Sequence, residues 1–337
     1  MSPSSHLRRV FTTVFALAAA LAASACVSQR GPGLGTEPSA IPTRYDEHRF
    51  YVTPVTTGGD TLAFILDSGI ASDLLSTEVA ARLRLPREPM VQGADTLWLA
   101  ALPALSPAAS IPAPDPAGPL QGRFLVVPLA GQGLLIARAG DAGVIGSSWL
   151  GNRVWTFDYP GRRLLLYPIG ARPLPLAAHQ VALGFAADAV GRRTSGLPRI
   201  TVQIDGDSLD MLFDTGATMN VSDSALAALA DGRPSRRAGS FVVESVFERW
   251  RRHHPEWRVI EGAEVPTGFA MIEVPQLEIG GYRVGPAWFT ARRDRDYHRA
   301  MDHLMDRPVV GSLGGSALHF FAVTIDYPRA VASFARP

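Results

Sequence analysis

The sequence contains no lysine and only one cysteine, and its charges almost cancel. One cysteine cannot form an internal disulfide framework or a zinc site built from several cysteines. With 32 basic and 31 acidic residues, the chain has no excess of positive charge, so we expect no nucleic-acid partner. Charged residues make up 19% of the chain and apolar residues 47%, which excludes extensive disorder. The 337 residues suffice for two units with their own cores, or for one large β-rich domain.

The N-terminal segment has no apolar run long enough to span a bilayer. Arg8 and Arg9 precede an apolar stretch over residues 10–23, which is shorter than the roughly 20 residues of a membrane-spanning helix. A short basic start followed by a short apolar run is typical of an export signal, so residues 1–25 are predicted to be a signal peptide. The run ends in Ala-Ser-Ala-Cys at Cys26, which resembles the lipobox of bacterial lipoproteins.

This resemblance implies that Cys26 becomes the first mature residue and carries a lipid that anchors the protein to a membrane. The alternative is ordinary cleavage after Ala25, which would leave a free thiol. Val27 follows the cysteine, and in lipoproteins of Gram-negative cells this favours the outer membrane. We therefore expect an exported, membrane-anchored lipoprotein of the periplasm. Residues 26–47 would form a tether, because this segment is rich in glycine and proline.

Two segments of the chain repeat each other. Residues 59–69 and 206–216 align without a gap, with five identical positions and two exchanges between serine and threonine. Each copy begins with an extended run, continues through a turn that contains glycine and aspartate, and enters a second apolar run that ends at Asp67 or Asp214. This is the pattern of a β-hairpin. Further along, Ser76 and Ser222 each precede a stretch that favours a helix, and both are predicted N-caps.

The copies also match at their far ends. Residues 144–146 correspond to residues 309–311, both apolar-apolar-Gly, and residues 157–160 correspond to 325–328. Asp67 and Gly146 are 79 residues apart in the first copy, whereas Asp214 and Gly311 are 97 residues apart in the second. The difference predicts an insertion of about 18 residues in the second copy. We expect this insertion at residues 241–259. The apolar residues there have helical spacing, which indicates a surface helix, a cover for a flap, or a contact with anionic lipid.

The matched aspartates are the strongest candidates for chemistry. Residues 67–69 read Asp-Ser-Gly and residues 214–216 read Asp-Thr-Gly, and each triplet follows an apolar strand. Such a strand delivers the carboxylate to the interior, where burial raises its pKa, and the glycine permits a tight turn behind it. One such triplet is a common turn sequence. Two in matching register are a much stronger signal: if the two copies pack about a pseudo-twofold axis, Asp67 and Asp214 meet across it.

With these motifs the chain resembles the aspartic proteases of the pepsin and retroviral-protease superfamily, in particular bacterial retropepsin-like proteins with two copies in one chain. The similarity covers most of residues 48–337. It implies an all-β, two-lobed, pseudo-twofold fold with short helices. The first lobe would comprise residues 48–170, a linker residues 171–197 and the second lobe residues 198–337.

The resemblance also assigns roles to particular residues. Asp67 and Asp214 would be the catalytic pair, which activates a water to hydrolyse a peptide bond without a metal or an organic cofactor. The hydroxyl groups of Ser68 and Thr215 would brace the two loops against each other. Gly69 and Gly216 would allow the tight turns of the motifs. Gly146 and Gly311 would let their strands pass close beneath the loops.

The substrate implied by the resemblance is a peptide or protein held in a cleft between the lobes of a monomer. Hairpin flaps are expected at residues 90–101, with Gly93 at the tip and Trp98 facing the substrate, and at residues 259–272. The alternative is a module that binds a peptide or protein in the same cleft without hydrolysing it. A serine hydrolase is disfavoured because the Gly-x-Ser-x-Gly motif is absent from the sequence.

The residues that follow the motif glycines predict the pH range of the pair. They are Ile70 and Ala217, where relatives commonly carry serine or threonine. A hydroxyl group at these positions can donate a hydrogen bond to the carboxylates, which lowers their pKa values. Since Ile70 and Ala217 have no such donor, we expect the singly protonated pair to persist to near-neutral pH.

Overall fold

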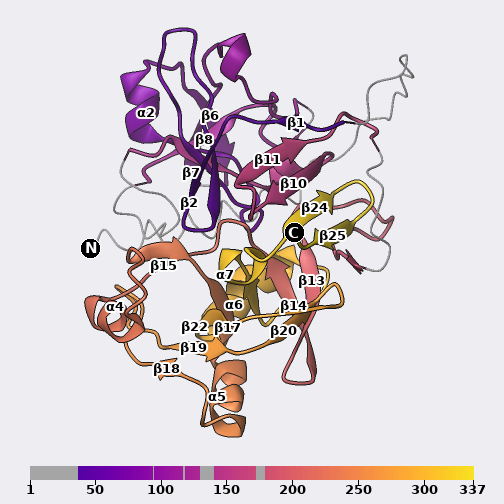
Figure 1. The fold of residues 1–337 in the computed structure, drawn as a ribbon. Coiled ribbons are helices and arrows are strands. Elements are labelled where there is room, and N and C mark those ends of the chain that lie inside the picture. Colours follow the sequence, from indigo (N-terminus) through magenta and orange to yellow (C-terminus); the bar gives the residue numbers. More distant parts are fainter. Residues whose placement is uncertain (1–36, 94, 117, 130–139, 172–178) are drawn as a thin grey trace.

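The computed structural model describes residues 37–337 except 94, 117, 130–139 and 172–178. Figure 1 shows the strands of the first copy in an upper lobe and those of the second copy in a lower lobe, with β10, β11, β24 and β25 beside each other between them. The chain is all-β with short helices, which confirms the predicted fold class. The predicted signal peptide and Cys26 lie outside the described residues.

The described strands of each lobe form a large sheet on the same plan. In spatial order, the first sheet contains β2 (Thr43–Asp46), β3 (Arg49–Val52), β4 (Phe64–Leu66), β9 (Gly143–Ile145), β5 (Leu74–Ser76), β8 (Phe124–Val127), β7 (Asp95–Ala100) and β6 (Glu88–Gln92). The second contains β18 (Val259–Ile260), β19 (Met271–Val274), β22 (Ala287–Arg292), β17 (Ser240–Val243), β23 (Gly311–Leu313), β14 (Asp207–Phe213), β13 (Arg199–Ile204), β20 (Leu277–Ile279) and β21 (Tyr282–Val284). The strand before the motif aspartate has the same neighbour in both sheets: β4 pairs in parallel with β9, and β14 pairs in parallel with β23.

A third sheet joins the lobes. Its order is β1 (Ser39–Ala40), β11 (Arg163–Leu166), β10 (Val154–Asp158), β24 (Ala322–Asp326), β25 (Val331–Ala335) and β12 (Gln180–Ala182). At its centre Thr156 lies opposite Thr324, the residue that matches it in the second copy, and their hydroxyl groups are 2.6 Å apart. An antiparallel pair in which a residue meets its own equivalent lies on a twofold axis, so the pseudo-twofold symmetry passes through this pair.

The strand pairing corrects the predicted position of the insertion. Leu74 in β5 and Phe241 in β17 occupy equivalent positions. Leu74 lies opposite the middle residue of β9 and Phe241 lies opposite the middle residue of β23, and these are the strands that pair in parallel with β4 and β14. Leu74 comes seven residues after Asp67, whereas Phe241 comes 27 residues after Asp214. The additional residues therefore lie at 217–239, which we call the lobe-2 insertion, and not at 241–259.

The lobe-2 insertion contains β15 (Thr218–Asn220), α4 (Asp223–Leu229) and β16 (Arg236–Ala238). As predicted, Ser222 caps α4 and Ser76 caps α2 (Thr77–Arg82). These two helices are nevertheless not equivalent. The partner of α2 is α5 (Glu244–His253), since each follows directly after β5 or β17. The apolar stripe of α5 is buried, and Figure 1 shows this helix at the far end of the lower lobe, which favours a surface helix over a flap cover.

Parts of the predicted tether and linker belong to the folded lobes. Within residues 26–47, β1 pairs with β11 and β2 pairs with β3. Within residues 171–197, β12 pairs with β25, and Leu197 is fully buried. A segment that is hydrogen-bonded into a sheet cannot act as a free spacer. The tether prediction is therefore wrong for residues 39–46, and the linker prediction is wrong for residues 180–182.

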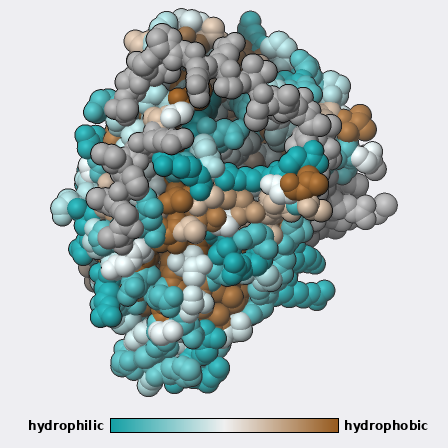
Figure 2. All heavy atoms as spheres, turned by 90° about the vertical axis from the view of Figure 1, so that its right-hand side faces the viewer, coloured by the Kyte–Doolittle hydropathy of each residue, from teal (hydrophilic) through white to brown (hydrophobic). Residues whose placement is uncertain are grey.

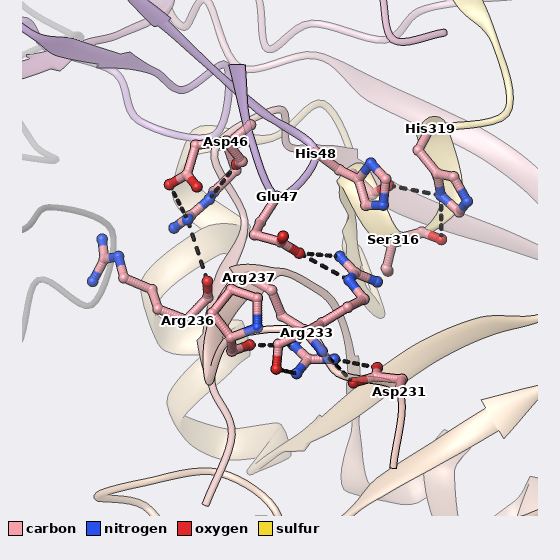
Figure 3. Close-up of polar contacts among 12 residues, drawn as sticks. Asp46, Glu47, His48, Asp231, Arg233, Arg236, Arg237, Ser316 and His319 are labelled. Carbon is pink, nitrogen blue, oxygen red and sulfur yellow. Dashed lines mark hydrogen bonds and ion pairs between the residues drawn. The ribbon is translucent and has the colours of Figure 1, made fainter. Parts of the chain in front are cut away.

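The tip of the β2–β3 hairpin enters the second lobe (Figure 3). Glu47 and His48 form its turn, both with positive φ, and the Glu47 carbonyl accepts a hydrogen bond from the amide of Ala238. Arg233 donates to the Glu47 carboxylate at 2.8 Å. The His48 ring stacks on His319 with 4.3 Å between centroids. The lobe-2 insertion thus holds the hairpin of the first lobe on one side, with His319 on the other.

The remaining helices are short, and the described residues include no helix that is both long enough and apolar enough to cross a membrane. They are α3 (Ser147–Leu150), α6 (Asp294–Met301), α7 (Gly315–Leu318) and the 3-10 helices η2 (Pro107–Ala109) and η4 (Asp302–Leu304). Figure 2 shows one face of the molecule, on which hydrophilic side chains surround a band of apolar ones near the centre. The main apolar core is continuous from Phe50 in the first lobe to Phe334 near the C-terminus.

Candidate active site

The two motif aspartates lie together at the junction of the lobes. Asp67 follows β4 and Asp214 follows β14, and both side chains are buried and in hydrogen-bonding contact with each other. The backbone places them in the same way, since the amide of Asp67 donates to Ile145 O at 2.9 Å and the amide of Asp214 donates to Leu313 O at 3.0 Å. The sequence repeat thus becomes a pair of carboxyl groups that face each other.

The hydroxyl residues of the motifs fasten the two loops to each other. The amide of Ser68 donates to Oγ1 of Thr215 at 3.1 Å, and the amide of Thr215 donates to Oγ of Ser68 at 3.0 Å. Each hydroxyl then donates across the interface to a backbone carbonyl, from Ser68 to Phe213 O and from Thr215 to Leu66 O. All four hydrogen bonds join one lobe to the other, so the relative position of the two aspartates depends on both copies.

The motif glycines are required by the opposite aspartate. A Cβ atom on Gly69 would lie 2.6 Å from Cγ of Asp214, and a Cβ atom on Gly216 would lie 2.3 Å from Cγ of Asp67. These distances are shorter than any van der Waals contact. Only glycine therefore lets each loop approach the carboxyl group of the other lobe.

The strand glycines beneath the loops are Gly146 and Gly314. A Cβ atom on Gly146 would lie 2.7 Å from Ile70 O, and one on Gly314 would lie 2.5 Å from Cβ of Ala217. The predicted partner of Gly146 was Gly311, which instead packs against Phe241 O, further back along the same strand. The apolar-apolar-Gly pattern was misleading because the segment that is equivalent to residues 144–146 reads Ser-Leu-Gly, at residues 312–314.

Burial determines the electrostatics of the pair. Loss of hydration raises the pKa of Asp67, although hydrogen bonds from Asp214 and from the Gly69 amide, which donates at 2.7 Å, act in the opposite direction. The pKa of Asp214 is raised well above its usual value by burial, and then by the neighbouring charge of Asp67. Oδ1 of Asp214 is buried and accepts no hydrogen bond from the described residues.

Ser312 is a polar contact of the pair that sequence reasoning missed. Its side chain is buried in β23, and the polar influence of its hydroxyl group lowers the pKa of Asp214. Its hydroxyl also lies 2.9 Å from the hydroxyl of Tyr297 in α6. A serine among the apolar residues of a predicted buried strand was the only available signal.

Asp73 is a second residue that was missed. Its carboxyl group accepts hydrogen bonds from the Gly146 amide at 2.9 Å and the Ser148 hydroxyl at 2.8 Å, where β9 passes into α3. Burial raises the pKa of Asp73 to about 7. Its equivalent in the second lobe is Ser240, whose hydroxyl accepts a hydrogen bond from the Gly314 amide at 3.0 Å. Both residues hold the strand glycine beneath the motif loop of their lobe.

Hairpins are present at both predicted flap positions. In the first lobe β6 and β7 pair over five residues, with Gly93 at positive φ in the turn. In the second lobe β18 pairs with β19, and the connection contains Gly262 and Gly268, both at positive φ. Trp98 is 45% exposed, on the opposite face of β7 from Leu97 and Leu99, which pack with Ile70.

Two further aspartates at matched positions of the copies have structural contacts. Asp158 accepts hydrogen bonds from the Gly161 amide and Arg163, and Asp326 accepts them from the amide and side chain of Arg329. Both therefore stabilise turns. In the described ranges, no three His, Cys, Asp or Glu side chains gather where they could hold a metal ion.

Comparisons with known proteins leave the family open. No protein-family model matches the chain, and no curated protein matches it in sequence. Among solved structures, the aspartic proteinase from Irpex lacteus aligns with 89% of this chain and 97% of its own, with a TM-score of 0.47 and 10% identity. The interpretation of the site therefore rests on its own geometry.

Proposed function

We propose that the chain is an aspartic endopeptidase in which Asp67 and Asp214 activate a water molecule. The observation that supports this proposal is the direct contact of two buried carboxyl groups, held by symmetric hydrogen bonds between the lobes. A buried acid pair is costly to a fold, because burial disfavours the charged form of each group. A site with no catalytic use for such a pair would gain stability by losing it.

The chemistry follows from the short distance between the carboxyl groups. Two carboxyl groups about 3 Å apart cannot both ionise, so the pair shares one proton over its working pH range. The ionised group takes a proton from water, which then attacks the peptide carbonyl. The protonated group donates a hydrogen bond to the developing oxyanion, and a proton then passes to the leaving amine. These roles belong to the pair and not to either residue alone.

The proposed substrate is an extended peptide or protein segment that binds between the lobes, under the β6–β7 and β18–β19 hairpins. The β6–β7 hairpin presents apolar side chains to solvent, since Val91 is 75% exposed and Trp98 is 45% exposed. Apolar groups on a hairpin can cover a peptide and exclude water from the reacting bond.

Amide substitutions at the two aspartates test this function. We expect Asp67→Asn and Asp214→Asn each to lower kcat/KM by at least about 10³-fold, because each removes a group that transfers protons. The measurement is cleavage of a peptide library between pH 4 and pH 8, and the exposed Asp223→Asn in α4 is the matched control. Near-wild-type turnover by either folded variant would contradict the proposal. Peptide binding without cleavage by the wild type would identify a binding module instead.

We also propose that the protein is an exported lipoprotein attached to the outer membrane through Cys26, as the Ala-Ser-Ala-Cys sequence indicates. Lipoprotein anchors carry more than one acyl chain, and two or more chains give stable membrane attachment. We expect mass spectrometry of the mature N-terminus to show a lipid-modified Cys26. The Cys26→Ser variant should move to the soluble fraction. An unmodified Cys26, or cleavage at another residue, would contradict the proposal.

A further inference from the structure

Asp73 is a buried carboxyl group that the proposed peptide hydrolysis does not use. It is 3% exposed and lies six residues after Asp67, directly before β5. Its Oδ1 atom accepts a hydrogen bond from the amide of Gly146 at 2.9 Å, and its Oδ2 atom lies 2.8 Å from the hydroxyl oxygen of Ser148. A buried polar group is costly unless it is hydrogen-bonded, and here both carboxyl oxygens have a partner.

These contacts fasten the motif loop of the first lobe at its second end. At its first end, the amide of Asp67 donates to Ile145 O at 2.9 Å. In the middle of the loop, Ile70 O accepts a hydrogen bond from the amide of Ser147 at 2.8 Å. At its second end, Asp73 binds the strand glycine and the first turn of α3. The loop that carries the first motif aspartate is thus attached to the junction of β9 and α3 at three points, and Asp73 supplies a side chain for one of them.

The second lobe has an uncharged group in the same place. Ser240 is the equivalent of Asp73, as the pairing of β5 and β17 shows. Its hydroxyl oxygen accepts a hydrogen bond from the amide of Gly314 at 3.0 Å and lies 2.8 Å from the hydroxyl oxygen of Ser316. Gly314 and Ser316 are the equivalents of the two partners of Asp73. The same two contacts are therefore made in the second lobe by a hydroxyl group, which carries no charge.

Asp73 has no ion-pair partner among the residues that the structure describes. The charged group that faces it is the guanidinium of Arg153, between α3 and β10, which lowers its pKa. Arg153 itself donates to the carbonyl oxygens of Trp149 and Ala113, and Asp115 acts on it in turn. Burial outweighs the influence of Arg153 and of the two hydrogen bonds, and it raises the pKa of Asp73 to about 7.

A protonated Asp73 keeps both contacts, because the Ser148 hydroxyl group can accept a hydrogen bond as well as donate one. We propose that Asp73 is a positioning residue, which holds the motif loop of the first lobe as a neutral carboxyl group and loosens it on ionisation. Ionisation places a charge without a counter-ion beneath the loop, which is strongly unfavourable in a buried site. Activity then depends on a proton that lies outside the aspartate pair. The inference rests on the proposed function only for this effect on turnover.

The direct test is the protonation state of Asp73 in the folded protein. Protein with ¹³C-labelled aspartate carboxyl groups would be titrated by NMR, and the Asp73 signal would be identified by its loss in Asp73→Asn. We expect a protonated Asp73 at pH 6 and an apparent pKa of about 7, well above the reference value of an aspartate side chain. An Asp73 signal that is already ionised at pH 6 would overturn the inference.

The pH profile separates positioning from a merely structural role. Asp73→Asn is neutral at every pH, and its amide keeps an acceptor for Gly146 and a donor for Ser148. Its kcat/KM should equal that of the wild type at pH 6. Relative to the wild type, it should rise by up to about tenfold at pH 8, where the wild-type carboxyl group is mostly ionised. Asp73→Leu has neither donor nor acceptor, so it should lower kcat at least about tenfold at both pH values, with little change in KM. Asp60→Asn, in an ion pair with Arg82 in the same lobe, is the control and should follow the wild type.

A constant ratio of kcat/KM between Asp73→Asn and the wild type from pH 6 to pH 8 would also overturn the inference. So would equal losses in the Asn and Leu variants, because these would show that the hydrogen bonds are not responsible. If Asp73→Leu does not fold, Asp73→Ala carries the same comparison. The NMR result does not depend on turnover. A protein without peptidase activity whose Asp73 is protonated at pH 6 would refute the proposed function alone, and an active enzyme whose Asp73 is ionised at pH 6 would refute this inference alone.

Discussion

At the scale of single residues, the site depends on two glycines whose replacement would push the aspartates apart. A Cβ atom on Gly69 or Gly216 would meet the opposite carboxyl group at 2.6 Å or 2.3 Å, so one loop would have to move. A displacement of about 1 Å at a catalytic centre can lower the rate about 10²-fold. We expect Gly69→Ala and Gly216→Ala each to lower kcat/KM by at least about 100-fold.

Gly58→Ala is the matched control for these two substitutions. Its Cβ atom would lie 3.6 Å from Oγ1 of Thr56, which is an ordinary contact, so activity should stay within about twofold of the wild type. Circular dichroism would show whether all three variants are folded. Full activity in both motif variants would show that the loops can move without harm, and that the geometry of the pair is not tightly held.

At the scale of elements, the β2–β3 hairpin and α7 form a contact that we expect to weaken in acid. Burial, followed by the charge of His319, lowers the pKa of His48 to about 3, and burial also lowers the pKa of His319. Both histidines are therefore neutral in the folded protein, stacked on each other beside Arg233 (Figure 3). In the unfolded chain they bind protons near the usual pKa of about 6.5.

The sign of the pH effect follows from these lowered pKa values. At these two histidines the unfolded state binds more protons than the folded state below about pH 6.5, so their contribution to stability falls as the pH drops from about 6.5 toward 3. The raised pKa values of Asp67, Asp73 and Asp214 act in the opposite direction, so the histidine contribution is measured as a difference between variants. In urea unfolding, we expect wild type to lose about 1–2 kcal/mol more between pH 6.5 and pH 4 than His48→Gln with His319→Gln, a value that allows for the partial exposure of the rings. The exposed His303→Gln should follow the wild type. An unchanged slope in the double variant would contradict the assignment.

The elements also show what the sequence could and could not predict. The β-hairpins, the two capped helices and the meeting of Asp67 with Asp214 were predictable, because each depends on a local pattern that the chain repeats. The insertion was misplaced because α2 and α4 have the same local signal, a serine before a helix, although only strand pairing shows that they differ. Ser312 was missed because an apolar pattern was sought where the functional site has a polar residue.

At the scale of the whole molecule, the lobes share a core and a sheet. The main apolar core runs through both lobes, and β10 pairs with β24 over five residues across the pseudo-twofold axis. Four hydrogen bonds of the motif loops and the contacts of the β2–β3 hairpin add to this interface. Neither lobe can open fully without exposing apolar surface of the other, so we expect the protein to unfold in a single cooperative transition.

Equivalent substitutions in the two lobes test this expectation. Val79 in α2 and Val246 in α5 are both 5% exposed, in helices that occupy the same place in the two copies. Replacing either with alanine removes buried methyl groups, at a cost of roughly 1–3 kcal/mol. In calorimetry, each variant should lower one common transition by a few degrees, with the calorimetric enthalpy equal to the van't Hoff enthalpy. Lobes that unfold independently would give the opposite result: Val79→Ala would shift one peak, Val246→Ala would shift another, and neither would affect both.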